Sequence, residues 1–364
     1  MIKMKLTAPD HILSITPYLP GKPLEELERE YGICNSIKLA SNENPLGSSP
    51  MAKIAIENAL KNLNRYPDGS GYYLIKGISE KCGVSPQNIV LGNGSDEIIS
   101  MLSQVFLAPG SEVIIPKPSF LMYDISVRST GAKPIYIPLK SLSINMEAMA
   151  DCVTDNTRMV FLTNPHNPTG TIITKADFEK FMAVIPAYAI VVIDEAYIEF
   201  ARESACLNGM DFFSEDRTIV VLRTFSKVYG LAGLRIGFGV MSSRIAELLN
   251  RIRLPFNASS LAQAGALAAL QDEDFLKKTI RLVHEELDYM FDALDRLSIR
   301  YFPTQANFFL IDVKKSADEV FERMLRRGVI VRSMTSYGYP EFIRVNVGLH
   351  DENVRFLETL KEET

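Results

Sequence analysis

The chain has 364 residues, a length that suits one large domain and one smaller domain. Hydrophobic residues make up 47% of it, enough for a sizeable core, and no apolar run is long enough to cross a membrane. A net charge of -5 argues against a nucleic-acid-binding surface.

Cysteine and histidine usage narrows the class of protein further. The four His residues show no His-Glu-x-x-His pattern, so we expect no dedicated metal site. The charged start at residues 1–6 is not followed by an apolar stretch, so we expect no signal peptide. The cysteines are far apart and form no Cys-x-x-Cys pair, which is typical of reduced thiols in a cytoplasmic protein. They are Cys34, Cys82, Cys152 and Cys206.

Short β-branched runs alternate with longer amphipathic runs between residues 89 and 240. In the run 96–106, the apolar residues recur at helical spacing and fall on one face. Strands that are apolar throughout and separated by helices indicate an α/β fold with a mainly parallel sheet covered on both faces. Seven strands are expected, at residues 89–91, 112–115, 134–137, 159–162, 189–193, 219–222 and 236–240.

The character of the chain changes near Asp272. A long charged helix is predicted over 275–297, followed by a strand at 307–311, a helix at 317–326 and a strand at 342–347. This pattern predicts a smaller α+β domain, completed by the N-terminal segment. We expect a large domain at residues 46–271 and a small domain made of residues 1–45 and 272–364.

Polar residues follow the predicted strands at the ends where parallel strands form sites. Asp194 comes directly after one strand, while Lys227 and Asn167 each lie five residues past another. Taken singly, Asp194 could be a strand-end turn or helix cap, and Lys227 a solvated surface residue. Together with Tyr197, they offer an amine, a carboxylate, an amide and a phenol, a set that would suit pyridoxal phosphate held as a Schiff base.

A glycine-rich segment, Gly-Asn-Gly-Ser-Asp-Glu at 92–97, opens the helix that runs to residue 106. The N–H groups of a first helical turn suit a phosphate, and glycines let it approach the backbone. The third glycine of a dinucleotide fingerprint is replaced by Glu97, and no P-loop sequence occurs. We therefore predict a phosphate cup for a cofactor other than NAD or ATP; the alternative is a helix capped by Ser95 or Asp96.

Three motifs in this order resemble the fold-type I, pyridoxal-phosphate-dependent aminotransferases of classes I and II. They are Asn-Pro-His-Asn-Pro-Thr-Gly at 164–170, Asp-Glu-Ala-Tyr at 194–197, and the segment 224–237 from Thr-Phe-Ser-Lys to Leu-Arg-Ile-Gly. Three further segments are similar to the histidinol-phosphate aminotransferase branch. These are Pro-Tyr-Leu-Pro-Gly-Lys-Pro at 17–23, Leu-Ala-Ser-Asn-Glu-Asn-Pro at 39–45 and Arg-Tyr-Pro-Asp at 65–68. The resemblance covers residues 10 to 348.

The resemblance implies a role for each candidate residue around pyridoxal phosphate. Lys227 would hold the cofactor covalently and then carry a proton at the reacting carbon. Asp194 would pair with the ring nitrogen, Asn167 and Tyr197 would bind the ring oxygen, and Phe120, where many relatives have Tyr, would stack on the ring. The phosphate would lie against Gly94, Ser95, Thr224, Ser226 and Arg235, with Asp96 as a further cofactor contact.

The resemblance also implies a homodimer and an anion pocket for the substrate. Tyr66 would reach the cofactor phosphate of the neighbouring subunit, so that two active sites are shared; the alternative is a half-buried Tyr before a turn. Arg332 and Arg344 would bind substrate anions. Tyr18 and Asn42 would complete the substrate site.

Three functions remain open at this point. The first is transamination of L-histidinol phosphate with 2-oxoglutarate, giving imidazole-acetol phosphate and L-glutamate in histidine biosynthesis. The second keeps the fold but changes the substrate or chemistry, as in an aromatic amino-acid aminotransferase or a threonine-phosphate decarboxylase. The third is a non-catalytic regulatory module, for which no residues remain to form a DNA-binding domain. Tyr18 and the Pro-Gly-Lys-Pro run after it favour the first.

Overall fold

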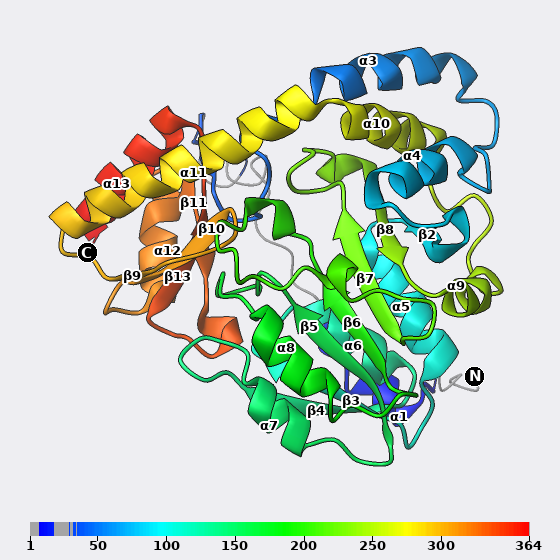
Figure 1. Cartoon of the computed structure of the whole chain (residues 1–364). Helices are drawn as coiled ribbons and strands as arrows, with labels where there is room; N and C mark the ends of the chain where they lie inside the picture. Colours follow the sequence, from blue (N-terminus) through cyan, green and yellow to red (C-terminus); the bar gives the residue numbers. More distant parts are fainter. Residues whose placement is uncertain (1–6, 18–28, 30–31, 34, 364) are drawn as a thin grey trace, which may run out of the picture.

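The computed structural model describes residues 7–17, 29, 32–33 and 35–363, and contains two main sheets and a separate two-stranded pair (Figure 1). The larger sheet has seven strands in the order β2-β8-β7-β6-β5-β3-β4. Its strands are β2 (Ile89–Gly92), β3 (Glu112–Lys117), β4 (Lys133–Pro138), β5 (Thr157–Thr163), β6 (Ile190–Asp194), β7 (Ile219–Thr224) and β8 (Gly237–Val240).

In the larger sheet, the carboxyl ends of the parallel strands lie at one edge, and the antiparallel strand β8 begins there. The pairs β4–β3, β3–β5, β5–β6 and β6–β7 are parallel, whereas β8 runs antiparallel to both β7 and β2. Gly237, which begins β8, therefore pairs with Thr224 and Gly92, which end β7 and β2. As a result, the residues before β8 lie at the same edge as the residues that follow the parallel strands.

Side chains along each strand of the larger sheet point alternately to its two faces, so a separate hydrophobic cluster lies on each face. In β6, Val191 and Ile193 pack into one cluster, while Ile190 and Val192 pack into the other. The first face is covered by α3 (Pro50–Ala59), α4 (Tyr72–Cys82), α7 (Met146–Asp151), α8 (Lys175–Met182) and α10 (Ser260–Gln271). The second is covered by α5 (Ser95–Phe106), α6 (Leu121–Ser129) and α9 (Ser243–Asn250).

The smaller sheet is antiparallel, in the order β12-β13-β10-β9. Its strands are β9 (Tyr301–Phe302), β10 (Phe308–Asp312), β12 (Arg332–Ser333) and β13 (Phe342–Asn346). A two-stranded parallel pair joins β1 (Ile37–Lys38) to β11 (Val329–Ile330). Other helices of the described residues are the short α1 (Asp10–Leu13), and α11 (Glu273–Arg296), α12 (Ala317–Arg326) and α13 (His350–Glu363), which lie on the smaller sheet's side.

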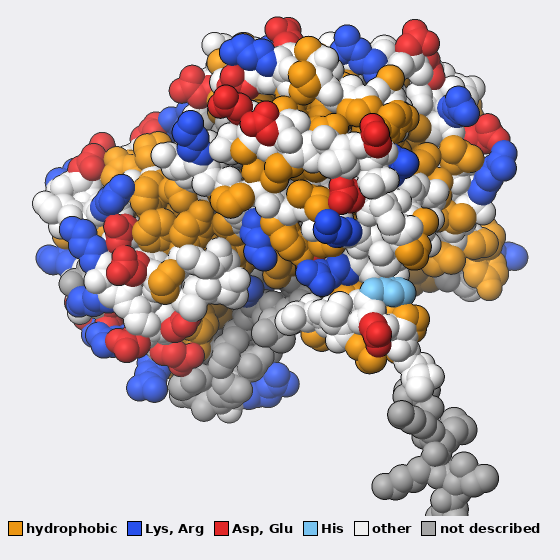
Figure 2. Space-filling view, turned by 90° about the horizontal axis from the view of Figure 1, so that it is seen from below, with side chains coloured by type: hydrophobic (Ala, Val, Ile, Leu, Met, Phe, Trp, Pro, Cys, Tyr) orange, Lys and Arg blue, Asp and Glu red, His pale blue; other side chains and the backbone are white. Residues whose placement is uncertain are grey.

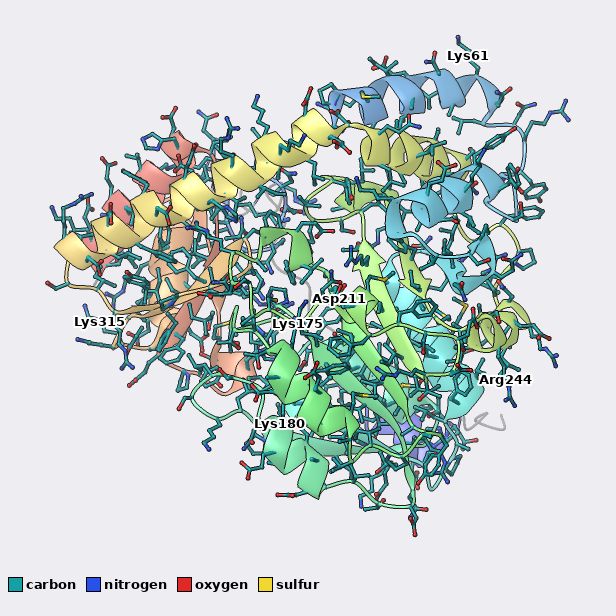
Figure 3. All side chains as sticks on the ribbon, in the orientation of Figure 1. Lys61, Lys175, Lys180, Asp211, Arg244 and Lys315 are labelled. Atoms are coloured by element: carbon teal, nitrogen blue, oxygen red, sulfur yellow. The ribbon has the colours of Figure 1, made fainter. Side chains whose placement is uncertain are left out.

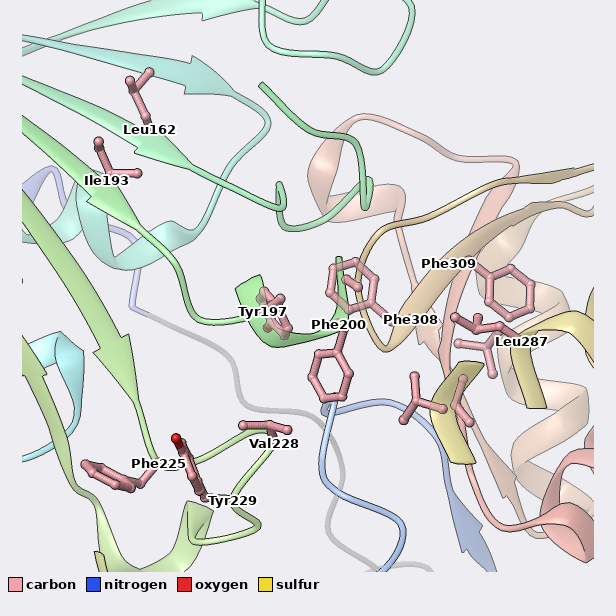
Figure 4. Close-up of a cluster of buried hydrophobic side chains, with 14 of the residues drawn as sticks. Leu162, Ile193, Tyr197, Phe200, Phe225, Val228, Tyr229, Leu287, Phe308 and Phe309 are labelled. Carbon is pink, nitrogen blue, oxygen red and sulfur yellow. The ribbon is translucent and has the colours of Figure 1, made fainter. Parts of the chain in front are cut away.

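The two sheets share a continuous hydrophobic core. Tyr197, after β6 of the larger sheet, packs edge-on against Phe308 of β10, with ring centroids 5.0 Å apart (Figure 4). Phe200, which follows Tyr197 by three residues, and Leu287, which lies in α11, belong to the same cluster. Burial of these side chains fixes the smaller sheet against the segment that follows β6.

The surface carries charges of both signs. On the face shown in Figure 2, acidic and basic side chains are interspersed, with hydrophobic side chains between them. Within the described ranges, no helix combines the length and the apolar character needed to cross a membrane.

The predicted fold class is confirmed, and all seven strands lie where the sequence predicts them, with ends that differ by at most two residues. The helix predicted at 317–326 has the predicted bounds, and the one predicted at 275–297 spans 273–296. The antiparallel direction of β8 was not predicted. The boundaries at residues 46 and 272 stay a prediction.

Gly230 allows two backbone segments to touch behind Lys227. Its φ is +68°, and a Cβ added to it would lie 1.9 Å from the carbonyl oxygen of Gly47. We predict that Gly230→Ala lowers the free energy of unfolding by about 1–2 kcal/mol for the left-handed backbone and by about 1–3 kcal/mol more for the clash. The matched control is Gly83→Ala, because Gly83 has φ +67° with no atom within 4 Å. Equal losses in urea unfolding would contradict the prediction.

Candidate active site

A pocket of about 220 Å³ opens at the edge of the larger sheet where β5, β6 and β7 end. Loops after these strands contribute to it, and the smaller sheet supplies side chains from β12 and β13. Among the residues that the structure describes, it thus brings together every predicted site residue except Tyr66. Those in the lining are Asn42, Gly94, Ser95, Asp96, Phe120, Asn167, Asp194, Tyr197, Thr224, Ser226, Lys227, Arg235, Arg332 and Arg344.

Lys227 lies in the loop after β7, with its amine in this pocket. Its Nζ donates a hydrogen bond to the carbonyl oxygen of Ser41, at 3.2 Å, and lies 5.6 Å from the centroid of the Tyr197 ring. The N-terminal part of the chain therefore orients the amine through a backbone atom. A primary amine held in this way can act as a nucleophile and as a proton carrier.

Asp194 is the last residue of β6 and is only 4% exposed. Its Oδ2 accepts a hydrogen bond from the Tyr123 hydroxyl, at 2.7 Å, and its Oδ1 accepts one from the Ala196 N–H, at 3.2 Å. Burial raises the pKa of this carboxyl to about 6; the Tyr123 bond opposes the rise and the charge of Asp96 adds to it. A buried carboxylate of this kind is stabilised when a cationic N–H is placed against it.

Tyr197 is the centre of a polar network that joins distant segments. Its hydroxyl accepts hydrogen bonds from Nδ2 of Asn42, at 3.0 Å, and from Nδ2 of Asn167, at 3.5 Å. The Oδ1 of Asn167 in turn accepts a bond from Nη1 of Arg344, at 2.7 Å, and Nη2 of Arg344 donates to the Ala40 carbonyl oxygen, at 3.1 Å. The network fixes the positions of a phenol, two amides and a guanidinium around the pocket.

The start of α5 forms the predicted cup. Gly94 is its N-cap, with φ +74°, and no side chain makes a capping bond there. The alternative of a helix capped by Ser95 or Asp96 is therefore wrong: Ser95 begins the helix, and Asp96 pairs instead with Arg235 at 3.2 Å. The first-turn N–H groups consequently keep their anion-binding capacity.

Glycines leave the space that such a cup needs. A Cβ added to Gly94 would lie 2.6 Å from Nη2 of Arg235, and one added to Gly237 would lie 2.7 Å from the Ser95 nitrogen. Arg235 itself adopts φ +52° and places Nη1 3.5 Å from the Ser226 hydroxyl. Hydroxyl, backbone N–H and guanidinium groups thus surround one small space, an arrangement that fits a phosphate.

The residues present fit pyridoxal phosphate as a whole. The cup suits its phosphate, the carboxylate of Asp194 suits a protonated ring nitrogen, and the polar groups around Tyr197 suit a ring oxygen. The primary amine of Lys227 lies in the same pocket as these groups. The chemistry of this donor set therefore agrees with the cofactor expected from the sequence.

Tyr66 is the described site residue that lies outside the pocket lining. Tyr66 is 83% exposed, so its description as a half-buried residue before a turn is wrong. Its ring stacks on Phe256 at a centroid distance of 4.8 Å. Its contact with a neighbouring subunit stays a prediction, and Tyr18 lies outside the described residues.

Several residues of the site were not predicted from the sequence. Tyr123 contacts Asp194, Ser41 contacts Lys227, and Thr163 and Tyr337 line the pocket. Tyr123 follows Phe120 by three residues, one helical turn, and this spacing could have shown that both side chains lie on the same face of α6. Ser41 acts through its carbonyl oxygen, which no side-chain pattern can reveal.

Comparison with known proteins gives a consistent result for the whole chain. The model of the family described as aminotransferase class I and II matches residues 35–359. A histidinol-phosphate aminotransferase from Desulfotalea psychrophila is 47% identical over 364 residues, which cover 99% of this chain and 96% of the relative. One from Moorella thermoacetica is 43% identical, covering 96% of this chain and 91% of the relative.

Solved structures share the fold at lower sequence identity. The histidinol-phosphate aminotransferase from Sinorhizobium meliloti, in complex with pyridoxal-5'-phosphate, has a TM-score of 0.91 at 24% identity, covering 99% of this chain and 98% of that one. The L-threonine-O-3-phosphate decarboxylase from Porphyromonas gingivalis has a TM-score of 0.79 at 21% identity, covering 90% and 98%. The fold alone therefore does not distinguish between these two reactions.

Proposed function

The chain belongs to the aminotransferase class I and II family, and from this premise we propose that it transfers the amino group of L-histidinol phosphate to 2-oxoglutarate. The products are imidazole-acetol phosphate and L-glutamate, as a step of histidine biosynthesis. The sequence identity of 47% over nearly the full length of a histidinol-phosphate aminotransferase supports this substrate over its alternatives. Within the pocket, the observation that carries the proposal is a pair of facing arginines.

Arg332 of β12 lies directly opposite Arg344 of β13 in the antiparallel register, and both line the pocket. Directly opposite residues of an antiparallel pair project from the same face, and like charges there destabilise the sheet. An anion bound between the two guanidinium groups would remove this repulsion. Histidinol phosphate carries a phosphate and glutamate carries two carboxylates, so one pair of guanidinium forks can serve both substrates in turn.

Pyridoxal phosphate, when bound, supplies an electron sink for the bond that is broken at the substrate's amino-bearing carbon. We propose that the Lys227 amine holds the cofactor and moves the proton at that carbon, and that Asp194 keeps the ring nitrogen protonated. Tyr197 and Asn167 would bind the ring oxygen, and Phe120 would contact the ring face. The phosphate would be bound by Gly94, Ser95, Thr224, Ser226 and Arg235, with Asp96 orienting the guanidinium.

We further propose a homodimer in which the active sites are shared. Large apolar side chains are exposed on α3, α4 and the segments near them, and such surfaces commonly mark interfaces. The 66–73 segment and the 252–256 segment form one surface, since Tyr66 stacks on Phe256 and Nη2 of Arg253 donates to the Gly69 carbonyl oxygen, at 3.0 Å. The exposed residues are Met51, Ile54, Leu60, Leu63, Tyr66, Tyr72, Tyr73, Ile252, Leu254 and Phe256.

A cytoplasmic location suits the cysteines. Cys82, Cys152 and Cys206 are free thiols in the structure, a state that a reducing compartment preserves. We propose this location together with small-molecule substrates and no nucleic-acid partner.

The attachment residue can be identified by chemical labelling. Borohydride reduction of the protein loaded with pyridoxal phosphate should fix the cofactor to the peptide that contains Lys227, and Lys227→Ala should lose transamination while retaining cofactor through its other contacts. The control is Lys175→Ala, because Lys175 pairs with Asp211 on the surface at α8 (Figure 3). Label on Lys175 or Lys180, measured by peptide mass spectrometry, would overturn the assignment.

The arginine pair predicts that the protein prefers a phosphorylated substrate to its unphosphorylated form. Arg332→Ala should raise KM for histidinol phosphate and lower kcat/KM by about 10- to 150-fold, the loss of roughly 1.5–3 kcal/mol from one charge-assisted contact. Arg344→Ala should impair both half-reactions, and unphosphorylated histidinol should be a poor substrate of the wild type. Arg326→Ala, on the exposed face of α12, is the control. Equal rates with histidinol and its phosphate, or a preference for phenylalanine or threonine phosphate, would contradict this substrate.

Site sharing can be tested by mixing two inactive chains. Lys227→Ala and Tyr66→Ala should each be nearly inactive alone, since each lacks one proposed contact in both sites. After subunit exchange, a hybrid dimer would contain one site with both residues intact, so part of the activity should return. Full activity of Tyr66→Ala, or of a monomer identified by light scattering, would contradict a shared site.

A further inference from the structure

Tyr123 makes a buried contact with Asp194 but is not among the residues proposed to touch the cofactor. Its hydroxyl donates to Oδ2 of Asp194 at 2.7 Å. Of the hydrogen bonds that described residues make to this carboxylate, it is the one from a side chain; the other comes from the Ala196 N–H. The orientation of the carboxylate in the pocket therefore depends on where α6 places this hydroxyl.

The Tyr123 ring is held firmly on two sides. It is fully buried, stacks on Phe161 of β5 with ring centroids 4.5 Å apart, and meets the edge of Phe120 at 5.6 Å. These ring contacts use no polar atom, so they remain when the hydroxyl is removed. The position of the hydroxyl is therefore set by packing against the sheet rather than by its bond to Asp194.

A second hydrogen bond fixes the direction of the first. The Tyr123 hydroxyl lies 2.9 Å from Oγ1 of Thr163, the last residue of β5. Because a phenol has one proton and a carboxylate accepts only, the Tyr123 proton points to Asp194 and the Thr163 hydroxyl donates to Tyr123. Burial raises the pKa of Tyr123 well above its ordinary value, so the phenol stays protonated and remains a donor.

We propose that Tyr123 is a positioning residue for Asp194, which holds the carboxylate ionised and turned toward the nitrogen of the cofactor ring. The inference rests on the proposed function, because it assigns Asp194 to that nitrogen. Phe120, the N-cap of α6, lines the same pocket one helical turn earlier. One helix therefore positions Phe120, which is proposed to contact the face of the cofactor ring. The same helix positions the hydroxyl that orients the carboxylate toward the ring nitrogen.

The test compares two tyrosines that each donate a hydroxyl to a carboxylate. Tyr123→Phe removes the donor to Asp194 and leaves the ring contacts in place. Tyr136→Phe is the control, because Tyr136 donates to Asp124, which does not line the active-site pocket. For each protein, we would measure the dissociation constant of pyridoxal phosphate from apoenzyme, the visible absorption band of the bound cofactor, and kcat and KM.

For Tyr123→Phe, we expect the dissociation constant of the cofactor to rise about tenfold or more, as for the loss of a hydrogen bond to a charged group. The absorption band should shift, because the protonation of the ring nitrogen changes the electron demand on the conjugated chromophore, and kcat should fall while KM for histidinol phosphate changes little. Tyr136→Phe should match the wild type in all three measurements. Thr163→Val, which removes the donor to Tyr123, should change the same quantities in the same direction by a smaller factor.

Three other results would overturn the inference. If the wild type binds pyridoxal phosphate through Lys227 while Tyr123→Phe keeps its affinity and spectrum, the positioning role is overturned and the proposed function stands. If Tyr123→Phe does not fold, Thr163→Val decides, and wild-type affinity and spectrum in that variant overturn the inference. If the wild type does not bind the cofactor, the proposed function is overturned and the inference with it.

Discussion

The buried carboxylate of Asp194 is the constraint around which the pocket is organised. An ionised group at the end of a central strand, only 4% exposed, is unfavourable unless donors and a counter-charge surround it. The protein supplies a phenol from α6 and the Ala196 N–H, and the carboxylate lines the pocket. A cofactor with a protonated ring nitrogen would complete the set, so the same burial that destabilises the charge creates a selective binding site.

Sheet topology places the other groups around this carboxylate. Parallel strands β5, β6 and β7 end at one edge, which brings Asn167, Asp194 and Lys227 together from segments separated by helices. The antiparallel β8 begins at that edge, so Arg235, two residues before it, reaches the start of α5. The smaller sheet then adds Arg344 through its bond to Asn167. The pocket is the meeting point of two sheets with different strand directions.

The sequence predicts those features that depend on local pattern. Apolar, β-branched runs mark the seven strands, and Asp194 stands out because a charged residue directly follows such a run. The direction of β8 is not predictable in this way, because the residues Gly-Phe-Gly-Val carry no signal for parallel or antiparallel pairing. The bond between Tyr123 and Asp194 joins residues 71 positions apart and depends on how α6 packs on the sheet. Ser41 contributes a carbonyl oxygen, which every residue has, so its contact with Lys227 follows only from tertiary structure.

The hydrogen bonds around Tyr197 span most of the chain. Asn42 donates its backbone N–H to Asn346 and its side-chain amide to Tyr197, and Arg344 donates to Asn167. A chain that has folded only one of its sheets therefore has no complete pocket, and a ligand that needs the whole pocket binds only the fully folded protein. Binding energy then becomes folding energy: free ligand at 100 times its dissociation constant adds about 2.7 kcal/mol to the stability. Cofactor supply in the cell would thus control how much of this protein survives proteolysis, as well as how much of it is active.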